Sequence, residues 1–389
     1  KRCLNFEKSK ILFINYQTEN IDFIKKVEAK AYELGVEEVY LRNEEIYKRH
    51  DVLKDISLAD IETEPLFDNA IWDAYANQNA SFLLLESEFP HLMDDVDPEK
   101  ISKMQIVDRK TKPVYKKKQL EYSIPWCIAT IPSIPWAKNM FPELDDKEAY
   151  DKLFKLICSM SMVDTRDPII SWNAYFDTQK KTVDKLNDLK ITKMVYKNSL
   201  GTNLTIYLHE SAIWRSAGRS DMIVNCPSFE IFTTPIFNKT EGIVYSSRPL
   251  CFNGSFIKDF YFVFKNGKVV DYGAKEGKDL LKGIITSDEY AAYLGEVALV
   301  PNNSPISNTG LVYGNTLLDE NASCHLALGA GFIDCLRIDK NITLEDMKKY
   351  GINPSKNHVD FMIGTPDLGI EVETNKGKIL MFKNGEFNI

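Results

Sequence analysis

The sequence predicts an α/β amino-terminal domain with parallel βαβ units, followed by an α+β, strand-rich carboxy-terminal domain. Three observations support this fold class: a strand, helix, strand order near the amino end, a change to strand-like texture after Lys190, and Asn-Gly pairs between strand-like runs. At about 100 to 200 residues per domain, a chain of 389 residues has the length for two domains. We therefore predict one domain over residues 1–190 and a second over residues 191–389.

The first βαβ unit occupies the amino end of the chain. Ile11-Leu12-Phe13-Ile14 is a short apolar run, apolar residues then recur at helical spacing from Ile24 to Leu34, and residues 36–41 form another strand-like run. This order is typical of parallel strands joined by a right-handed crossover. Further elements of the first half are expected as helices at 71–77, 147–160 and 172–189, and as strands at 81–85 and 126–131.

The second half is predicted to consist of strands separated by turn residues. Residues 202–208, 260–264 and 269–272 alternate between apolar and polar residues or are continuously apolar. Asn266-Gly267 and Asn384-Gly385 each lie between two strand-like runs. A type I′ turn favours this residue pair because both of its central residues need a positive φ, so we predict a β-hairpin at each pair.

Composition and charge argue against several classes of protein. With 44% hydrophobic and 27% charged residues, the chain has an ordinary globular composition. The net charge of −8 and the pI near 5.4 argue against nucleic-acid binding, which needs a basic surface to displace phosphate counterions. The most apolar segment, 124–137, contains three prolines and is shorter than the roughly 20 residues of a membrane helix, so no membrane contact is expected. Seven widely spaced cysteines without a CxxC pair indicate reduced thiols and a cytoplasmic protein.

Two of the five histidines lie in informative surroundings, and the first is His358. His358 and Asp360 flank Val359 in a strand-like run, so the two-residue period of a strand places both side chains on one face. Val359, Phe361 and Ile363 would then face the core. An imidazole and a carboxylate side by side on a rigid strand can bind a divalent metal, and a surface hydrogen bond between them is the plainer alternative.

The second histidine, His325, follows Asp319 and Glu320 and precedes Gly329. Polar capping residues before it and a glycine after it predict a short helix, whose small apolar residues would bury the imidazole at least in part. A buried histidine usually bonds a backbone carbonyl group, so metal binding by His325 is the less common alternative. Asp319 and Glu320 are expected to cap the helix or to support metal ligands rather than bind the metal.

Glu230 and Glu296 each interrupt an apolar strand-like run, where an unpaired charge is costly. A buried carboxylate needs a cation, and a metal ion is the strongest one available. A salt bridge to an arginine such as Arg215, Arg219 or Arg248 is the alternative.

These two glutamates, two histidines and one aspartate are enough for a dinuclear site with one or two bridging carboxylates. Two metals about 3.5 to 4 Å apart can share a water, lower its pKa and polarise a scissile carbonyl group. The mixed ligand set suits zinc, cobalt or manganese. The chain has no HExxH helix, GxSxG elbow or Walker loop, so chemistry by a serine or cysteine nucleophile has little support.

The same residues lie in motifs that resemble a known family, the thermophilic metalloaminopeptidases of the AmpS/AmpT/PepS type. The motifs are Pro-Ser-Phe-Glu-Ile-Phe-Thr-Thr-Pro (227–235), Leu-Gly-Glu-Val-Ala-Leu-Val-Pro (294–301), Ser-Pro-Ile-Ser (304–307), Asn-Thr-Leu-Leu-Asp-Glu-Asn-Ala-Ser-Cys-His-Leu-Ala-Leu-Gly (315–329) and His-Val-Asp-Phe-Met-Ile-Gly (358–364). The resemblance implies that the metal ligands are Glu230, Glu296, His325, His358 and Asp360.

The resemblance also implies a function. It implies an aminopeptidase that releases amino-terminal residues from peptides with a free amino terminus, with a carboxy-terminal catalytic domain, two divalent metals and a homodimer that encloses a cavity. Glu296 is the candidate for the shared or base-like catalytic carboxylate. Two alternatives stay open: a metal-binding homologue of weakened activity that binds peptide amino termini, and a dinuclear amidohydrolase of other specificity.

The chain departs from the family pattern at two aromatic residues. Phe229 stands where the family usually has a second acidic residue, and Phe332 stands where it has a tyrosine. A phenol there could donate a hydrogen bond to the reaction's oxyanion, and the loss of one such donor costs about 10² to 10³ in rate. We therefore expect a more apolar pocket and an altered side-chain preference.

Overall fold

The computed structural model describes residues 2–62, 69–218, 222–252, 254–339 and 342–389. The chain forms two compact units, each assembled from separate segments. Unit 1 comprises Lys1–Ile169, Gly218–Ser228 and Asn253–Ser255, and unit 2 comprises Ile170–Ala217, Phe229–Phe252 and Phe256–Ile389. The division at residue 190 stays a prediction.

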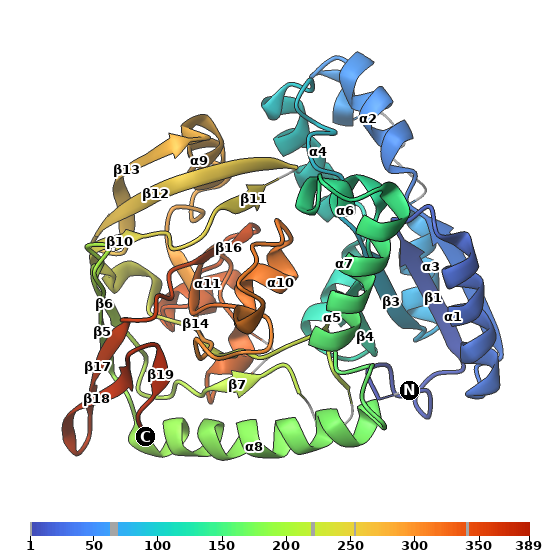
Figure 1. Cartoon of the computed structure of the whole chain (residues 1–389). Helices are drawn as coiled ribbons and strands as arrows, with labels where there is room; N and C mark the ends of the chain where they lie inside the picture. Colours follow the sequence, from blue (N-terminus) through green and yellow to red (C-terminus); the bar gives the residue numbers. More distant parts are fainter. Residues whose placement is uncertain (1, 63–68, 219–221, 253, 340–341) are drawn as a thin grey trace. The chain divides into compact units, whose positions relative to one another are not determined.

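Unit 1 alternates strands and helices. Its strands are β1 (Ile11–Tyr16), β2 (Glu38–Asn43), β3 (Ser81–Glu86), β4 (Trp126–Thr130) and β8 (Asn225–Cys226). Its helices are α1 (Ile21–Glu33), α2 (Ile46–Asp55), α3 (Ala70–Asn77), α4 (Pro98–Lys110), α5 (Pro113–Leu120), α6 (Ile134–Met140) and α7 (Asp146–Met160), with a 3₁₀ turn at Asp60–Glu62. The strands pair in parallel in the order β2-β1-β3-β4-β8, which confirms the predicted βαβ units, and Figure 1 shows α1 running alongside β1.

The continuous apolar run of β1 follows from burial on both faces of this sheet. Leu12 and Ile14 pack in a cluster with Ile24 of α1, whereas Phe13 packs in a separate cluster with Trp72 of α3. Successive side chains of a strand point to opposite faces, so a parallel sheet covered by helices on both sides needs apolar residues at every position.

Unit 2 combines one long helix with two antiparallel sheets. Helix α8 (Pro168–Leu189) ends beside the carboxy terminus, where Lys185 Nζ donates to the Ile389 carbonyl oxygen at 3.0 Å (Figure 1). The larger sheet has the order β11-β12-β10-β6-β5-β17-β18-β19, with β13 paired to β12. Its strands are β5 (Lys193–Lys197), β6 (Asn203–Tyr207), β10 (Glu241–Tyr245), β11 (Leu250–Phe252), β12 (Ser255–Lys265), β13 (Lys268–Glu276), β17 (Gly369–Thr374), β18 (Gly377–Lys383) and β19 (Glu386–Phe387).

The smaller sheet of unit 2 has the order β16-β15-β14-β9-β7. Its strands are β7 (Arg215–Ser216), β9 (Ile231–Thr233), β14 (Leu294–Leu299), β15 (His325–Gly329) and β16 (His358–Met362). The remaining elements are α9 (Lys278–Ile285), α10 (Thr316–Glu320), α11 (Leu344–Lys349) and 3₁₀ turns at Phe237–Lys239, Ser307–Thr309 and Ile333–Cys335. Leu294, Val297 and Leu326 of this sheet share one core with Phe262 and Val372 of the larger sheet.

Both predicted hairpins are confirmed. Asn266 and Gly267 join β12 to β13 with φ angles of 50° and 78°, and Asn384 and Gly385 join β18 to β19 with φ angles of 51° and 74°. The two positive φ angles in each turn are those that a type I′ turn requires.

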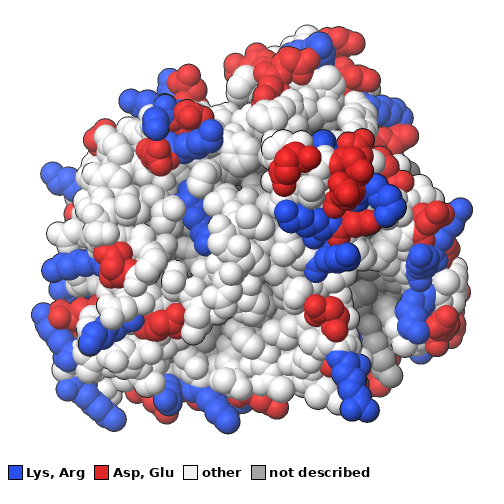
Figure 2. Space-filling view, viewed as in Figure 1, with Lys and Arg blue, Asp and Glu red and all other residues white. Residues whose placement is uncertain are grey.

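The surface carries charges of both signs. Figure 2 shows acidic and basic side chains intermingled over the viewed face, in keeping with the small net negative charge. Among the described residues, no helix combines the length and the apolarity needed to cross a membrane.

Candidate metal centre

The predicted ligands lie on the smaller sheet of unit 2. Asp360 of β16 lies opposite Ala327 of β15, which lies opposite Glu296 of β14, and in the next row His325 lies opposite Ala298. Directly opposed residues share a face of the sheet. The two alanines occupy little volume, so the longer carboxylate and imidazole side chains have room to meet over this face.

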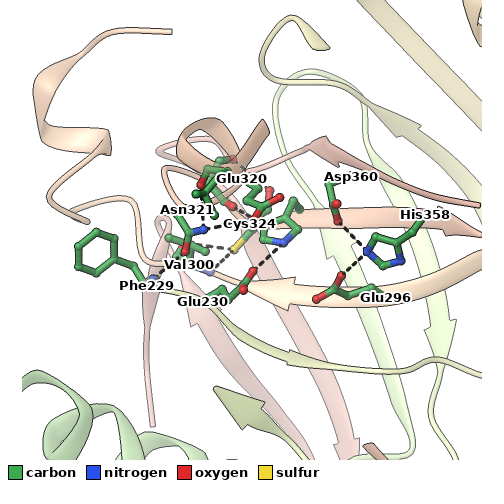
Figure 3. A network of polar contacts seen from close by, with 12 residues as sticks. Phe229, Glu230, Glu296, Val300, Glu320, Asn321, Cys324, His358 and Asp360 are labelled. Atoms are coloured by element: carbon green, nitrogen blue, oxygen red, sulfur yellow. Dashed lines mark hydrogen bonds and ion pairs between the residues drawn. The ribbon is translucent and has the colours of Figure 1, made fainter. Parts of the chain in front are cut away.

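The structure brings all five predicted residues together. The ligand atoms of Glu230, Glu296 and His325 lie within 4.8 Å of one another, and so do those of Glu296, His358 and Asp360. Figure 3 shows Glu296 and Asp360 both directed toward the His358 ring. Glu296 belongs to both groups, which places it between two potential metal positions.

His358 is the most exposed of the five predicted ligands. Its side chain is 29% exposed, whereas those of Glu296, Glu230 and His325 are 5%, 8% and 1% exposed. The predicted alternation of this strand is confirmed, because Val359 and its apolar neighbours on the opposite face lie in the core of unit 2.

Both imidazoles are oriented by backbone carbonyl groups. His325 Nδ1 donates to the Ser323 carbonyl oxygen at 3.1 Å, and His358 Nδ1 donates to the Ala330 carbonyl oxygen at 3.0 Å. This leaves Nε2 of each ring facing a carboxylate: His325 Nε2 lies 3.2 Å from Glu230 Oε2, and His358 Nε2 lies 3.1 Å from Glu296 Oε2. In metal-binding histidines, likewise, a hydrogen bond from Nδ1–H orients the ring so that Nε2 faces the metal.

The predicted helix around His325 is wrong. Helix α10 ends at Glu320, and His325 is the first residue of β15, which pairs with β14 on one side and β16 on the other. Asp319 does not cap a longer helix, because its carboxylate accepts hydrogen bonds from the Tyr313 and Gly314 amides. Strand pairing on both sides outweighs the local helical signal.

Glu320 belongs to the centre, although the sequence pattern predicted only a capping or supporting role. It is 8% exposed and interacts electrostatically with Asp360, Glu230 and His325. Burial, reinforced by the charge of Asp360, raises the pKa of Glu320 well above its usual range. No signal in the sequence pointed to this role, because Asp319 and Glu320 were expected at the start of a helix, where carboxylates interact favourably with the helix dipole.

The centre is rich in acid and poor in cations. Among the described residues, no lysine or arginine forms an ion pair with Glu230, Glu296, Glu320 or Asp360, and Arg219, one of the predicted salt-bridge partners, lies outside these residues. Burial raises the pKa of Glu296 to about 7. Although burial opposes it, the hydrogen bond to Glu230 raises the pKa of His325 to about 10. Protonated histidines therefore supply the positive charge where no metal is bound.

One buried oxygen atom also lacks a hydrogen-bond donor. Asp360 Oδ1 has no hydrogen-bond partner, and His358 Nε2 lies 3.4 Å from it. A buried carboxylate oxygen without a donor is costly, and a divalent cation at this position would satisfy it. The donor set of carboxylates and Nε2 atoms, which lose their protons when a metal binds, therefore fits divalent metals.

The two aromatic departures have different surroundings. Phe229 is 1% exposed, packs against Trp172 and Tyr175 of α8 with ring centroids 5.6 and 5.2 Å away, and points away from the carboxylates (Figure 3). The expectation that Phe229 makes the pocket more apolar is therefore wrong, because its ring belongs to the core. Phe332 instead packs on the His358 ring at 5.3 Å and on Phe232 at 5.2 Å.

The backbone beside Phe229 holds Glu230 in place. The Phe229 amide donates to Asn321 Oδ1 at 2.6 Å, and Gln179 Nε2 of α8 donates to the Glu230 carbonyl oxygen at 2.9 Å. These two bonds tie the residues before β9 to α8 and to the loop after α10, so Glu230 reaches the centre from a rigid backbone.

Comparison with known proteins decides the family. The family model for thermophilic metalloproteases (M29) matches residues 1–387. The chain belongs to the M29 family. The M29 chain is therefore a metallopeptidase, which confirms the family and the enzyme class predicted from the motifs, and family membership implies a divalent metal.

Individual M29 relatives match over almost their whole length. The chain is 33% identical to Aminopeptidase 2 of Geobacillus stearothermophilus over 384 residues, which cover 96% of this chain and 92% of the relative. It is 32% identical to Aminopeptidase AmpS of Bacillus subtilis (strain 168), with coverages of 99% and 95%. The solved structure of wild-type AmpT from Thermus thermophilus matches with a TM-score of 0.87 at 28% identity and covers 99% of this chain and 96% of that one.

Proposed function

We propose that this M29 chain is an aminopeptidase that releases amino-terminal residues from peptides at a site for two divalent metals. The observation that carries the proposal is the position of Glu296, which belongs to two groups of potential ligands at once. The relatives named as aminopeptidases support the exopeptidase assignment. The proposal includes a catalytic domain over residues 191–389 and a homodimer, as the family resemblance implies.

The residues divide into two sets around Glu296. Glu230 and His325 would hold one metal, His358 and Asp360 would hold the other, and Glu296 would be shared. Zinc, cobalt and manganese all suit this mixture of carboxylate and imidazole ligands. Divalent metals in such a site supply Lewis-acid polarisation of the scissile carbonyl group and activation of water.

The chain's own carboxylates bind the substrate amine and move the proton. The acid-rich centre attracts a protonated α-amine, which explains a preference for peptide amino termini. Glu320 is buried beside the five ligands and has no ion pair among the described residues. We assign Glu296 as the shared carboxylate. The positive charge of bound metals would lower the raised pKa of Glu320, which could then accept a proton from water and return it to the leaving amine.

The decisive test is hydrolysis of leucine anilide by chelated protein that is re-supplied with zinc, cobalt, manganese or magnesium. We expect metal-dependent turnover that Glu296→Gln abolishes and that Glu320→Gln lowers while two metals stay bound. An N-acetylated leucine anilide should not be cleaved, because its amine carries no charge. Cleavage of the acetylated substrate at an equal rate would instead support an amidohydrolase of other specificity.

The second candidate function, a metal-binding homologue with weakened activity, is favoured by Phe332. Its ring packs on His358 and offers no hydrogen-bond donor. If a donor is what the centre lacks, Phe332→Tyr should raise kcat by about 10²-fold at unchanged metal content. Efficient turnover by the native chain, unchanged in Phe332→Tyr, would reject this candidate.

A further inference from the structure

Strand β14 carries a β-bulge directly before Glu296. Its register with β15 passes from Leu294 opposite Leu328 to Glu296 opposite Ala327, so no residue of β15 lies opposite Gly295. A bulge of this kind inserts one extra residue into a strand, bends the strand and redirects the side chains that follow.

The bulge decides on which face of the sheet Glu296 lies. Leu294 and Val297 both belong to the core of unit 2, although they are three positions apart. Successive side chains of a regular strand point to opposite faces, so without the extra residue Glu296 would share the face of Leu294. With the bulge, Glu296 lies on the other face, where its Oε2 is 3.1 Å from His358 Nε2.

A threonine holds the carbonyl group of the bulge. Thr234, which directly follows β9, is 2% exposed, and its Oγ1 donates to the Gly295 carbonyl oxygen at 2.7 Å. A buried backbone carbonyl group needs such a donor. The hydrogen bond fixes the peptide group immediately before Glu296 and so restricts where the carboxylate can point.

The same hydroxyl group also reaches the segment that orients His358. Thr234 Oγ1 accepts a hydrogen bond from the Phe332 amide at 3.3 Å. The Ala330 carbonyl oxygen, two residues before Phe332, accepts the hydrogen bond from His358 Nδ1 at 3.0 Å. One buried hydroxyl group therefore links the backbone beside Glu296 to the backbone that orients His358.

We propose that Thr234 is a positioning residue of the metal centre, which fixes Glu296 and His358 relative to each other through these two hydrogen bonds. This role rests on the proposed two-metal site and adds to it a residue that binds neither metal nor substrate. Thr234 lies in the same sequence motif as Glu230, so that one short segment supplies a ligand and the support of two others.

The test compares Thr234→Ala with Thr234→Ser, which differ from each other only in the hydroxyl group. Zinc affinity is measured by competition with a chromogenic chelator, and ligand geometry by the visible absorption spectrum of the cobalt-loaded protein. We expect Thr234→Ala to weaken zinc binding by about 10- to 100-fold, the usual cost of losing a partner outside the ligand shell, and to change the cobalt spectrum. Thr234→Ser should keep the native affinity and the native spectrum.

The preceding residue, Thr233, supplies the matched control. It is also buried, and its Oγ1 donates to the Ile213 carbonyl oxygen at 3.0 Å. Thr233→Ala removes one hydrogen bond as well, so it should lower the midpoint of thermal unfolding about as much as Thr234→Ala does. Its zinc affinity and cobalt spectrum should nevertheless stay native. Equal losses of zinc affinity in the two variants would reduce Thr234 to a structural role and overturn the proposal.

Native zinc affinity and a native cobalt spectrum in Thr234→Ala would also overturn it. If Thr234→Ala lacks the native circular dichroism spectrum, Thr234→Val, which keeps the volume and loses the donor, is measured against the same criteria. Both readouts are independent of catalysis. A native chain that binds two metals but does not hydrolyse leucine anilide would count against the aminopeptidase, and the zinc and cobalt measurements would still decide the role of Thr234.

Discussion

Unit 1 holds half-buried acidic side chains and unit 2 holds buried ones, and the two units neutralise them in different ways. In unit 1, Arg49 forms ion pairs with Glu44 at 2.8 Å and with Asp108 at 2.7 Å, and Asn15 Nδ2 also donates to Glu44. In unit 2, four carboxylates meet two histidines and, among the described residues, no lysine or arginine.

The pKa shifts express this contrast. Although burial opposes it, the Arg49 guanidinium lowers the pKa of Glu44, whereas burial raises the pKa of Glu296 to about 7. The network of unit 1 is complete without any added group, and the centre of unit 2 is completed only by protons or metals. The absence of a lysine or arginine among the described residues, more than the number of acids, is what makes the centre of unit 2 a candidate metal site.

The largest expected difference is between two matched substitutions, one aspartate in each cluster. The substitution in unit 2 should lower activity, and the one in unit 1 should lower stability. Asp360→Asn removes a ligand and should lower kcat/KM by about 10³-fold or more, beyond the 10- to 100-fold cost of losing a residue that merely supports a ligand. Asp108→Asn in unit 1 should leave kcat/KM within about twofold and lower the free energy of unfolding by about 1 to 3 kcal/mol, because Arg49 loses a partner. Kinetics and urea unfolding of both variants would measure this. Equal losses of activity in the two variants would break the comparison.

The next largest effect is expected on the stability of the protein when the metals are removed, and this effect should depend on pH. Free metal at 1,000 times its Kd stabilises a site by about 4 kcal/mol, which a chelator removes. The folded pKa values of Glu296, about 7 against 4.5, and of His325, about 10 against 6.5, are both raised. The metal-free native state therefore holds more protons than the unfolded state between about pH 4.5 and 10, and its stability falls as the pH rises through this window.

Thermal unfolding with and without chelator at pH 6 and pH 9 would test this prediction. We expect the midpoint of the chelated protein to fall more steeply with pH than that of the metal-loaded protein. A chelated protein that becomes more stable toward pH 9 would contradict the assigned shifts.

A smaller loss is expected at the glycine before Glu296. A Cβ added at Gly295 would lie 2.2 Å from the carbonyl oxygens of Gly329 and Ala330, and the Ala330 oxygen is the one that orients His358. Gly295→Ala must shift this backbone, and a displacement near 1 Å at a catalytic group costs about 10² in rate. Gly369→Ala is the matched control, since its Cβ would meet nothing closer than 3.9 Å. Normal activity of Gly295→Ala would show that His358 does not depend on this carbonyl group.

The smallest effect is expected in unit 1, at Glu86, a carboxyl group whose pKa is raised like that of Glu296 in the candidate metal centre. Burial, reinforced by the charge of Glu44, raises the pKa of Glu86 to about 7. This group stabilises the fold fully below its unfolded pKa of 4.5, and the contribution is lost as the pH rises through 7. Glu86→Gln should remove about 2 kcal/mol of this pH dependence, measured by urea unfolding at pH 4.5 and 8. An identical pH dependence in the variant would place the titration elsewhere.

Local sequence patterns were sufficient to predict much of the fold and most residues of the candidate metal centre. The apolar runs of β1 and β3 predicted the parallel sheet, and each Asn-Gly pair predicted its hairpin, because periodicity and turn chemistry depend on a few adjacent residues. His358 and Asp360 were correctly placed on one face for the same reason.

Only the folded chain decided the features that depend on distant residues. His325 lies on a strand because β14 and β16 pair with it from both sides, Phe229 lies in the core because α8 supplies Trp172 and Tyr175, and Glu320 lies beside Asp360. None of these contacts leaves a periodic signal in the sequence, since each partner lies tens of residues away. A local pattern indicates on which face of a strand or helix a side chain lies. Tertiary packing determines which residues that side chain contacts.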